Sequence, residues 1–174
     1  GGSNAPLVIL LDDGWSAAAS WDIRIKTADE LIAKADNDRR GVALVALSEP
    51  ARDITLMPAG AARVALRQIV PKPYSIDRVD TLGAVDRFLK ATGEAEIAWL
   101  SDGVDTGRGV EFVEGLGKTI GERKLTLFEA GAPAALALAA AENAAAKMTV
   151  KVLRTGGGVA AGVVRAIDAK GSPI

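Results

Sequence analysis

The chain of 174 residues contains no cysteine and no histidine. Without cysteine it has no thiol nucleophile and no disulfide, and without either residue it cannot form the common zinc sites. The absence of histidine also removes the side chain that most often acts as a general acid or base near neutral pH. Most familiar catalytic constellations are therefore excluded, and we expect that the protein is not an enzyme.

Long apolar runs and an excess of charge of one sign are also missing. Hydrophobic residues make up 49% of the chain, but no uninterrupted apolar stretch approaches the roughly 20 residues that a membrane-spanning helix needs. The 21 basic and 22 acidic residues are interspersed, so no basic stripe is available to bind a phosphate backbone. We therefore expect a soluble chain that does not bind nucleic acid.

Short apolar runs separated by helical patterns are what the sequence does contain. The runs are continuous rather than alternating, which is typical of central parallel strands covered on both faces, and they lie at residues 7–11, 42–47, 97–100 and 125–128. Between them, apolar residues recur at helical spacing. Strands that alternate with helices predict an α/β fold with a doubly wound, mostly parallel sheet, followed here by C-terminal β-strands.

Local signals predict where several of these elements begin and end. Ser20 and Asp80 are each expected to cap a helix, because short polar side chains accept hydrogen bonds from the free N–H groups of the first turn. Gly93 is expected to end the second of these helices. A short alternating segment at residues 53–57 is expected to form a hairpin or an edge strand beside the second apolar run.

The last third of the chain has a different composition. Alanine dominates residues 133–147, yet alternating leucines favour strands there, and residues 149–153 and 163–167 read as a β-hairpin around a triple glycine. An isolated hairpin is marginally stable, so this one either extends the sheet or begins another β-domain. The expected division is residues 1–5 as a cloning remnant, 6–131 as the α/β domain, and 132–174 as a C-terminal β-strand extension that starts a truncated β-domain.

Polar side chains follow three of the buried runs at the point where each run ends. Asp12 and Asp13 follow the first run, Ser48 the second, and Ser101 and Asp102 a later one. In an open α/β sheet the carboxyl ends of the strands line the crevice where ligands bind, so these side chains are the first candidates for a site. Their oxygens are ligands of the kind that magnesium or calcium prefers.

This pattern resembles the metal-ion-dependent adhesion site of the von Willebrand factor A domain, over roughly residues 6–131. The family pattern is D-x-S-x-S after the first strand, then a threonine at a middle helix, then a T-D-G-like aspartate after a later strand. The residues that fall on matching positions, and that the resemblance assigns to the metal site, are Asp12, Ser16, Thr81 and Asp102.

The chain departs from the family pattern at two positions. Gly14 stands where the first metal-binding serine belongs, and Ser101 replaces the threonine that precedes the last aspartate. One direct ligand is lost, so the resemblance implies a degenerate site that binds magnesium weakly or not at all, and no other cofactor. If the alignment is right, the substitution Gly14→Ser should strengthen magnesium binding.

The resemblance implies a non-catalytic module that binds another protein at the strand-end face. Asp13, Trp15 and Ser101 are expected to belong to this partner-binding face, with a lid packed over the empty metal position as the other interpretation of Trp15. Trp99, inside a buried run, is expected in the core. A degenerate A domain followed by β-strands also resembles membrane-anchored bacterial proteins of the Bat aerotolerance type, which have an N-terminal double transmembrane region. That implies the soluble, periplasmic part of a bacterial inner-membrane protein, which meets the membrane only through segments outside this chain.

Two other classes of function share part of the pattern. A receiver-like phosphoacceptor, or another small-ligand-binding α/β domain, is the alternative, but a receiver needs a lysine after its last strand, where this chain has Glu129 and Ala130. The glycines at residues 103–109 form no phosphate-binding fingerprint. A hydrolase with paired carboxylates is disfavoured, because Asp12 and Asp13 are adjacent on a strand and should point to opposite faces.

Overall fold

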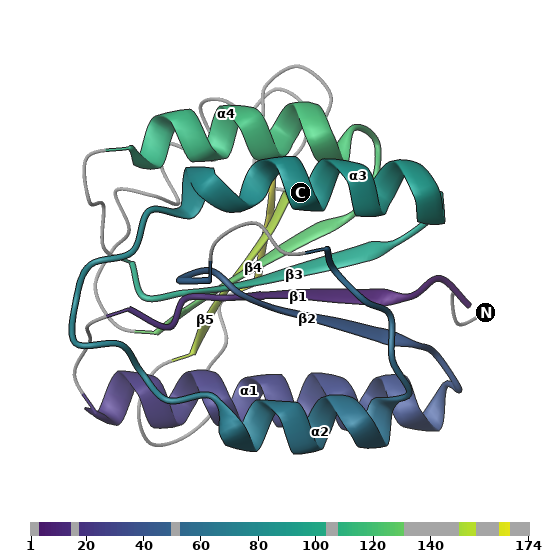
Figure 1. Cartoon of the computed structure of the whole chain (residues 1–174), viewed down its shortest axis with the longest axis horizontal. Coiled ribbons are helices and arrows are strands. Elements are labelled where there is room, and N and C mark those ends of the chain that lie inside the picture. Colours follow the sequence, from purple (N-terminus) through teal and green to yellow (C-terminus); the bar gives the residue numbers. More distant parts are fainter. Residues whose placement is uncertain are drawn as a thin grey trace.

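The computed structural model shows a six-stranded sheet covered by helices on both faces (Figure 1). It describes residues 4–14, 18–49, 53–103, 108–130, 150–155 and 164–167. In spatial order the strands run β2-β1-β3-β4-β5-β6. Their bounds are β1 (Leu7–Leu11), β2 (Val42–Ala46), β3 (Glu96–Ser101), β4 (Leu125–Ala130), β5 (Val150–Thr155) and β6 (Val164–Ile167).

The strand directions confirm the predicted fold class. All neighbouring strands from β2 to β5 are parallel, and β6 alone runs antiparallel to its neighbour β5. The chain leaves β1, forms β2 on one side of it, and returns to form β3 on its other side. In a doubly wound sheet this reversal creates a crevice at the carboxyl ends of the two strands where ligands usually bind. Here that switch point lies at the ends of β1 and β3.

Helices cover the two faces in pairs: α1 (Ala18–Asn37) and α2 (Ala59–Gln68) lie on one face, and α3 (Leu82–Thr92) and α4 (Gly109–Ile120) on the other (Figure 1). A 3-10 helix, η1 (Arg78–Thr81), directly precedes α3. All five residues of β1 are buried; Ile9 belongs to the core under α1 and α2, and Leu10 to the core under α3 and α4. The continuous apolar run is therefore explained by burial on both faces.

The helix starts differ from the prediction. Helix α1 begins before Ser20, and Asp80 lies within η1, so neither residue caps an α-helix. The capping residue is Asp77, whose carboxylate accepts a hydrogen bond from the N–H of Val79 at 3.1 Å. Gly93 does end α3, with a φ of 83° that glycine adopts without strain.

The predicted strand at residues 53–57 is reduced to one bridge. Met57 and Val42 exchange two backbone hydrogen bonds of 2.9 Å in an isolated antiparallel bridge beside β2. Asp53, Thr55 and Leu56 are all exposed, so little apolar area holds this segment against the sheet. Among the described residues, the hairpin expected here is therefore not formed.

The C-terminal hairpin of β5 and β6 extends the sheet, because β5 pairs in parallel with β4. This is one of the two outcomes that the sequence allows for the hairpin. The alanine-rich segment and the triple glycine lie outside the described residues. A further β-domain beginning at residue 132 stays a prediction, and so does the cloning remnant at residues 1–5, of which the carbonyl of Ala5 accepts a hydrogen bond from Nε of Arg40 at 2.6 Å.

Candidate functional site

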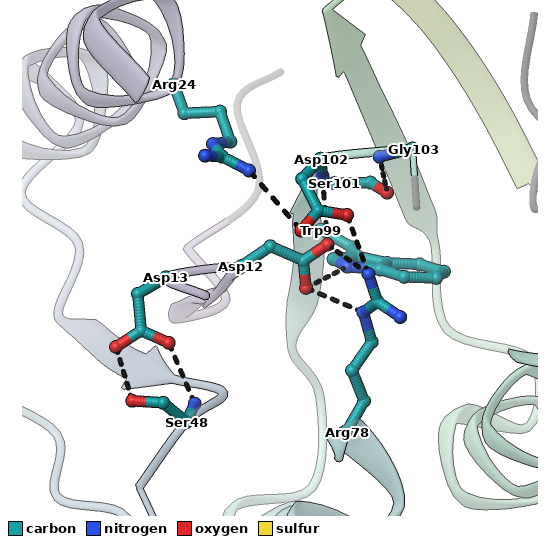
Figure 2. Close-up of polar contacts among 9 residues, drawn as sticks. All are labelled: Asp12, Asp13, Arg24, Ser48, Arg78, Trp99, Ser101, Asp102 and Gly103. Carbon is teal, nitrogen blue, oxygen red and sulfur yellow. Dashed lines mark hydrogen bonds and ion pairs between the residues drawn. The ribbon is translucent and has the colours of Figure 1, made fainter. Parts of the chain in front are cut away.

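Asp12 and Asp102, which follow the adjacent strands β1 and β3, lie side by side at the switch point (Figure 2). The backbone N–H of Asp102 donates a hydrogen bond to Oδ2 of Asp12 at 2.9 Å. Asp12 is fully buried, and the Asp102 side chain is only 6% exposed. The two carboxylates therefore meet at the carboxyl edge of the sheet, as the parallel topology predicts.

The guanidinium group of Arg78 joins these two carboxylates. Its Nε and Nη2 donate to Oδ1 and Oδ2 of Asp12, each at 2.8 Å, in a bidentate pair. The same Nη2 also donates to Oδ1 of Asp102 at 2.8 Å. Bidentate arginine–carboxylate pairs are strong and directional. Arg78, from the first position of η1, thus fixes the ends of β1 and β3 to each other.

Two more side chains complete a cluster that we call the Arg78 network, which consists of Asp12, Arg24, Arg78, Trp99 and Asp102 (Figure 2). Nε1 of Trp99 donates to Oδ1 of Asp12 at 3.3 Å, and the Arg78 guanidinium carbon lies 5.7 Å from the centre of the Trp99 ring. Nη1 of Arg24, on α1, is 3.9 Å from Oδ2 of Asp102. Two guanidinium groups thus balance two carboxylates, which offsets part of the cost of burying them.

The ionisation of Asp12 reflects a balance between burial and its partners. Burial alone would raise the pKa of Asp12, because desolvation disfavours the charged form. The hydrogen bonds and positive charge of Arg78, with the N–H groups of Asp102 and Trp99, outweigh burial and hold the pKa below its ordinary value of 3.8. Asp12 is therefore ionised at neutral pH, and it carries the charge that Arg78 binds.

Asp13 points away from the Arg78 network (Figure 2). Its Oδ1 accepts a hydrogen bond from the backbone N–H of Ser48 at 2.8 Å, and its Oδ2 accepts one from the Ser48 hydroxyl at 2.6 Å. Burial raises the pKa of Asp13 above its ordinary value, and the Ser48 hydrogen bonds only partly oppose this. Because Asp12 and Asp13 bind different partners on opposite sides, they do not flank one substrate as a hydrolase pair would.

Of the remaining predicted site residues, two form hydrogen bonds within the domain near the carboxyl edge, and two lie outside the described residues. Thr81 is buried at the end of η1, where its hydroxyl donates to the carbonyl of Arg78 at 2.7 Å. It therefore holds the turn that carries Arg78. The hydroxyl of Ser101 accepts a hydrogen bond from the N–H of Gly103 at 3.0 Å. Trp15 and Ser16 lie outside the described residues.

Asp13 and Ser101, two residues of the predicted partner-binding face, are buried in the structure. Both residues have no exposed area, because each lies at the end of a strand that is covered on both faces. Their side-chain oxygens form hydrogen bonds within the domain. A partner would therefore have to contact the residues that lie over Asp13 and Ser101 rather than these side chains themselves.

The described residues of this site do not fit a divalent cation. Each carboxylate oxygen of Asp12 already accepts two hydrogen bonds, and the Arg78 guanidinium lies between Asp12 and Asp102. A magnesium ion would need the same oxygens and would meet a positive charge at contact distance. Within the described part of the chain, no three acidic side chains come together as a metal-binding group.

The packing around position 14 gives a second explanation for the glycine there, besides the loss of a metal ligand. A Cβ atom at this position would lie 3.0 Å from Cγ2 of Ile76 and 3.2 Å from the backbone oxygen of Tyr74. The Ile76 side chain and the backbone of Tyr74 would therefore have to give way by a few tenths of an ångström to admit a serine. The close approach of residues 74–76 favours glycine here, and the expected gain in magnesium binding from Gly14→Ser stays a prediction.

Arg24 and Arg78 are site residues that are not predicted from the sequence, although each carries a signal. Arg78 stands at the start of a helix, where the helix dipole disfavours a positive charge. Arg24 is spaced four residues before Ala28 and eight before Ile32, so it lies on the apolar stripe of α1. A charged residue at either position indicates a buried acidic partner.

Comparisons with known proteins agree with the fold. No family model matches the chain, and no curated protein matches it. Among solved structures, a von Willebrand factor type A protein from Catenulispora acidiphila is similar, with a TM-score of 0.57 and 19% identity over 88% of this chain and 39% of that chain. Proximal thread matrix protein 1 from the mussel byssus has a TM-score of 0.60 and 12% identity, over 87% of this chain and 43% of that one.

These similarities define the fold class. The chain has a von Willebrand factor A-like fold, which is a form of the doubly wound, Rossmann-like α/β architecture. It spans about two-fifths of the length of the two similar structures.

Proposed function

We propose that this chain is a non-catalytic protein-interaction domain that binds its partner at the carboxyl edge of the sheet, over the Arg78 network. The observation that carries this proposal is the position of Tyr74. This tyrosine is 54% exposed, and its backbone lies against Gly14 at the switch point. The von Willebrand A-like fold supports a protein-interaction role of this general kind.

The segment that carries Tyr74 is anchored to the edge. Residues 69–77 cross the carboxyl end of the sheet, from α2 on one face to η1 on the other (Figure 1). The N–H of Lys72 donates to the backbone carbonyl of Asp13 at 2.7 Å, and Ile76 is buried. The segment is therefore tied to the strand ends at more than one point, and the Arg78 network lies directly beyond its C-terminal end.

The composition of the segment suits a binding surface. Pro71 and Pro73 fix two φ angles on either side of Lys72, which leaves less backbone freedom to lose on binding. Val70 is 64% exposed, so the segment presents an aliphatic and an aromatic side chain to solvent. Tyrosines on rigid backbone are prominent among the residues that dominate protein–protein affinity.

A non-catalytic role also agrees with the burial and the hydrogen bonds of the Asp12 carboxylate. Asp12 is fully buried, and both of its oxygens accept hydrogen bonds from Arg78 and its neighbours. A receiver-like phosphoacceptor needs a carboxylate oxygen that is open to attack a phosphoryl donor. No described contact favours that alternative or the small-ligand-binding one, so protein binding is the function that we propose.

The proposal includes a location. We infer that the chain is the soluble, periplasmic part of a bacterial inner-membrane protein, anchored by segments outside residues 1–174. The support for this is the resemblance to Bat-like proteins, together with the A-like fold. In the described part of the chain, no helix has both the length and the apolar character that crossing a membrane requires.

A photo-crosslinking amino acid in place of Tyr74 is expected to capture a specific protein when the chain is expressed in cells of its source organism. With that partner purified, Tyr74→Ala should weaken binding about tenfold or more, because truncation of an aromatic anchor commonly costs this much. Glu122, exposed in the turn after α4 at the opposite edge, provides the matched control for both experiments. Equal crosslinking at both positions, or unchanged affinity in a folded Tyr74→Ala variant, would contradict the proposed surface.

A further inference from the structure

We propose that Arg78 is a built-in cation, which replaces a divalent metal ion at the carboxyl edge of this sheet. The domain then folds and presents its edge without any divalent ion. A consequence is that removal of the Arg78 side chain converts Asp12 and Asp102 into a site for a hard divalent cation. This inference rests on the Arg78 network and does not depend on which partner the domain binds.

The guanidinium group of Arg78 occupies the position that a metal ion between the two carboxylates would need. Nη2 of Arg78 donates to Oδ2 of Asp12 and to Oδ1 of Asp102, each at 2.8 Å, so one nitrogen bridges the ends of β1 and β3. A metal ion that bound one oxygen from each carboxylate would have to lie at about the position of this nitrogen. Two cations cannot occupy that position together.

The charges of the Arg78 network also disfavour a divalent ion beside Arg78. The side chains of Arg24 and Arg78 balance those of Asp12 and Asp102, and all four are at most 6% exposed. A divalent ion added to these four side chains would give them a net charge of +2 in a buried site, which is costly. Exchange of Arg78 for the same ion raises the total charge by only one. The site therefore accepts a divalent ion only in place of Arg78.

The neighbouring indole supplies a direct readout. Nε1 of Trp99 lies 3.3 Å from Oδ1 of Asp12, so an ion held between the two carboxylates would lie close to the Trp99 ring. Manganese, a hard divalent ion that binds carboxylate oxygens, quenches the fluorescence of a nearby tryptophan. Trp21 also lies near the network, because its ring is 5.4 Å from the Arg24 guanidinium. Quenching that is largely lost in Trp99→Phe, and kept when Trp15 and Trp21 are replaced by phenylalanine, therefore reports an ion at this position.

The test compares the full chain with its Arg78→Ala and Arg78→Met variants. Arg78→Ala removes the charge and opens space, whereas Arg78→Met removes the charge and fills the space. We expect Arg78→Ala to bind one manganese ion per chain at least about tenfold more tightly than either the wild type or Arg78→Met, and calcium or magnesium should compete with it. A further Trp99→Phe substitution should remove most of the quenching by manganese, replacement of Trp15 and Trp21 by phenylalanine should leave it, and a further Asp102→Asn should abolish binding.

Thermal unfolding gives a second readout that does not depend on tryptophan fluorescence. The wild type should melt at the same temperature in magnesium chloride and in a chelator at matched ionic strength, whereas the melting temperature of Arg78→Ala should rise with magnesium concentration. Stabilisation of the wild type by magnesium would overturn the proposal. So would an Arg78→Ala variant that binds no manganese, or one that stays unfolded in every divalent cation, because the proposal requires a metal ion to take over the function of the guanidinium.

Discussion

Asp12→Asn is expected to lower the free energy of unfolding at pH 7 by about 3 to 5 kcal/mol, because removal of one partner from a buried ion pair leaves the other charge uncompensated. The substitution keeps the shape of the side chain but removes the charge that Arg78 binds through two hydrogen bonds of 2.8 Å. Among the described ion pairs of Arg78, the one with Asp102 would remain, and Asp102 also lies 3.9 Å from Nη1 of Arg24. Urea unfolding, with the slope of the transition checked for each variant, measures the loss.

The matched control is Asp13→Asn, an identical change at the next residue, which is equally buried. The amide oxygen of asparagine can still accept the hydrogen bond from the Ser48 N–H. Burial raises the pKa of Asp13, so the fold already disfavours its charged form. We expect a change of less than about 1 kcal/mol. Similar losses of stability in the two variants would contradict a special contribution of the ion pair between Asp12 and Arg78.

The pH dependence of stability should separate the two aspartates by sign. The pKa of Asp12 in the folded state lies below 3.8, so its contribution is fully present above that pH and is lost as the pH falls toward the folded value. The pKa of Asp13 is raised, so its contribution is present below 3.8 and is lost as the pH rises through the folded value. The stability difference between the wild type and Asp12→Asn should therefore shrink as the pH falls below 3.8.

Trp99→Ala is expected to destabilise the domain by about 3 to 5 kcal/mol, the usual cost of deleting a buried aromatic side chain. Trp99 is 1% exposed, and its ring meets that of Phe112 edge-to-face at a centroid distance of 5.0 Å. Trp99→Phe keeps a ring against Phe112 but loses the N–H that binds Asp12, so a smaller loss of about 1 to 2 kcal/mol is expected. A loss below about 1 kcal/mol for Trp99→Ala in the same urea experiment would contradict the position of the ring under the network.

Much of the fold could be predicted from the sequence, because the burial of an element determines the pattern of its apolar residues. The run at residues 7–11 is continuous and apolar because β1 is covered on both faces. The meeting of Asp12 and Asp102 could also be predicted, since residues that follow adjacent parallel strands share one edge of the sheet. These inferences need only the strand direction and the alternation of helices with strands.

The centre of the site could not be predicted, because its partners are far apart in the chain. Arg78 is separated from Asp12 by 66 residues, and no local spacing relates the two. Asp80 and Asp77 fit a capping position equally well by residue type, and the turn selects Asp77 while Thr81 holds the Arg78 carbonyl. The oxygen ligands of a metal site can thus be predicted from the residues that follow the strands. A guanidinium group in place of the metal ion cannot be predicted in this way, because it reaches the site through a tertiary contact.

Gly14 shows how one residue supports two different interpretations. In the sequence it marks the place of a missing serine ligand. In the fold it gives the room that Ile76 and the backbone of Tyr74 require. Ser16 and Trp15, beside it, lie outside the described residues, so their assignment to the metal site and to the partner-binding face stays a prediction.

The coupling free energy between Asp12 and Arg78 most directly tests whether an internal ion pair holds the carboxyl edge together. It comes from urea unfolding of the wild type, Asp12→Asn, Arg78→Met and the double variant at pH 7. We expect the double variant to lose at least about 2 kcal/mol less than the sum of the two single losses, because removal of both partners leaves no unpaired charge between them. The same cycle on the exposed pair Arg63–Asp29, whose closest atoms are 2.9 Å apart, should show little coupling. Additive losses for Asp12 and Arg78 would contradict the ion pair as the element that holds this edge.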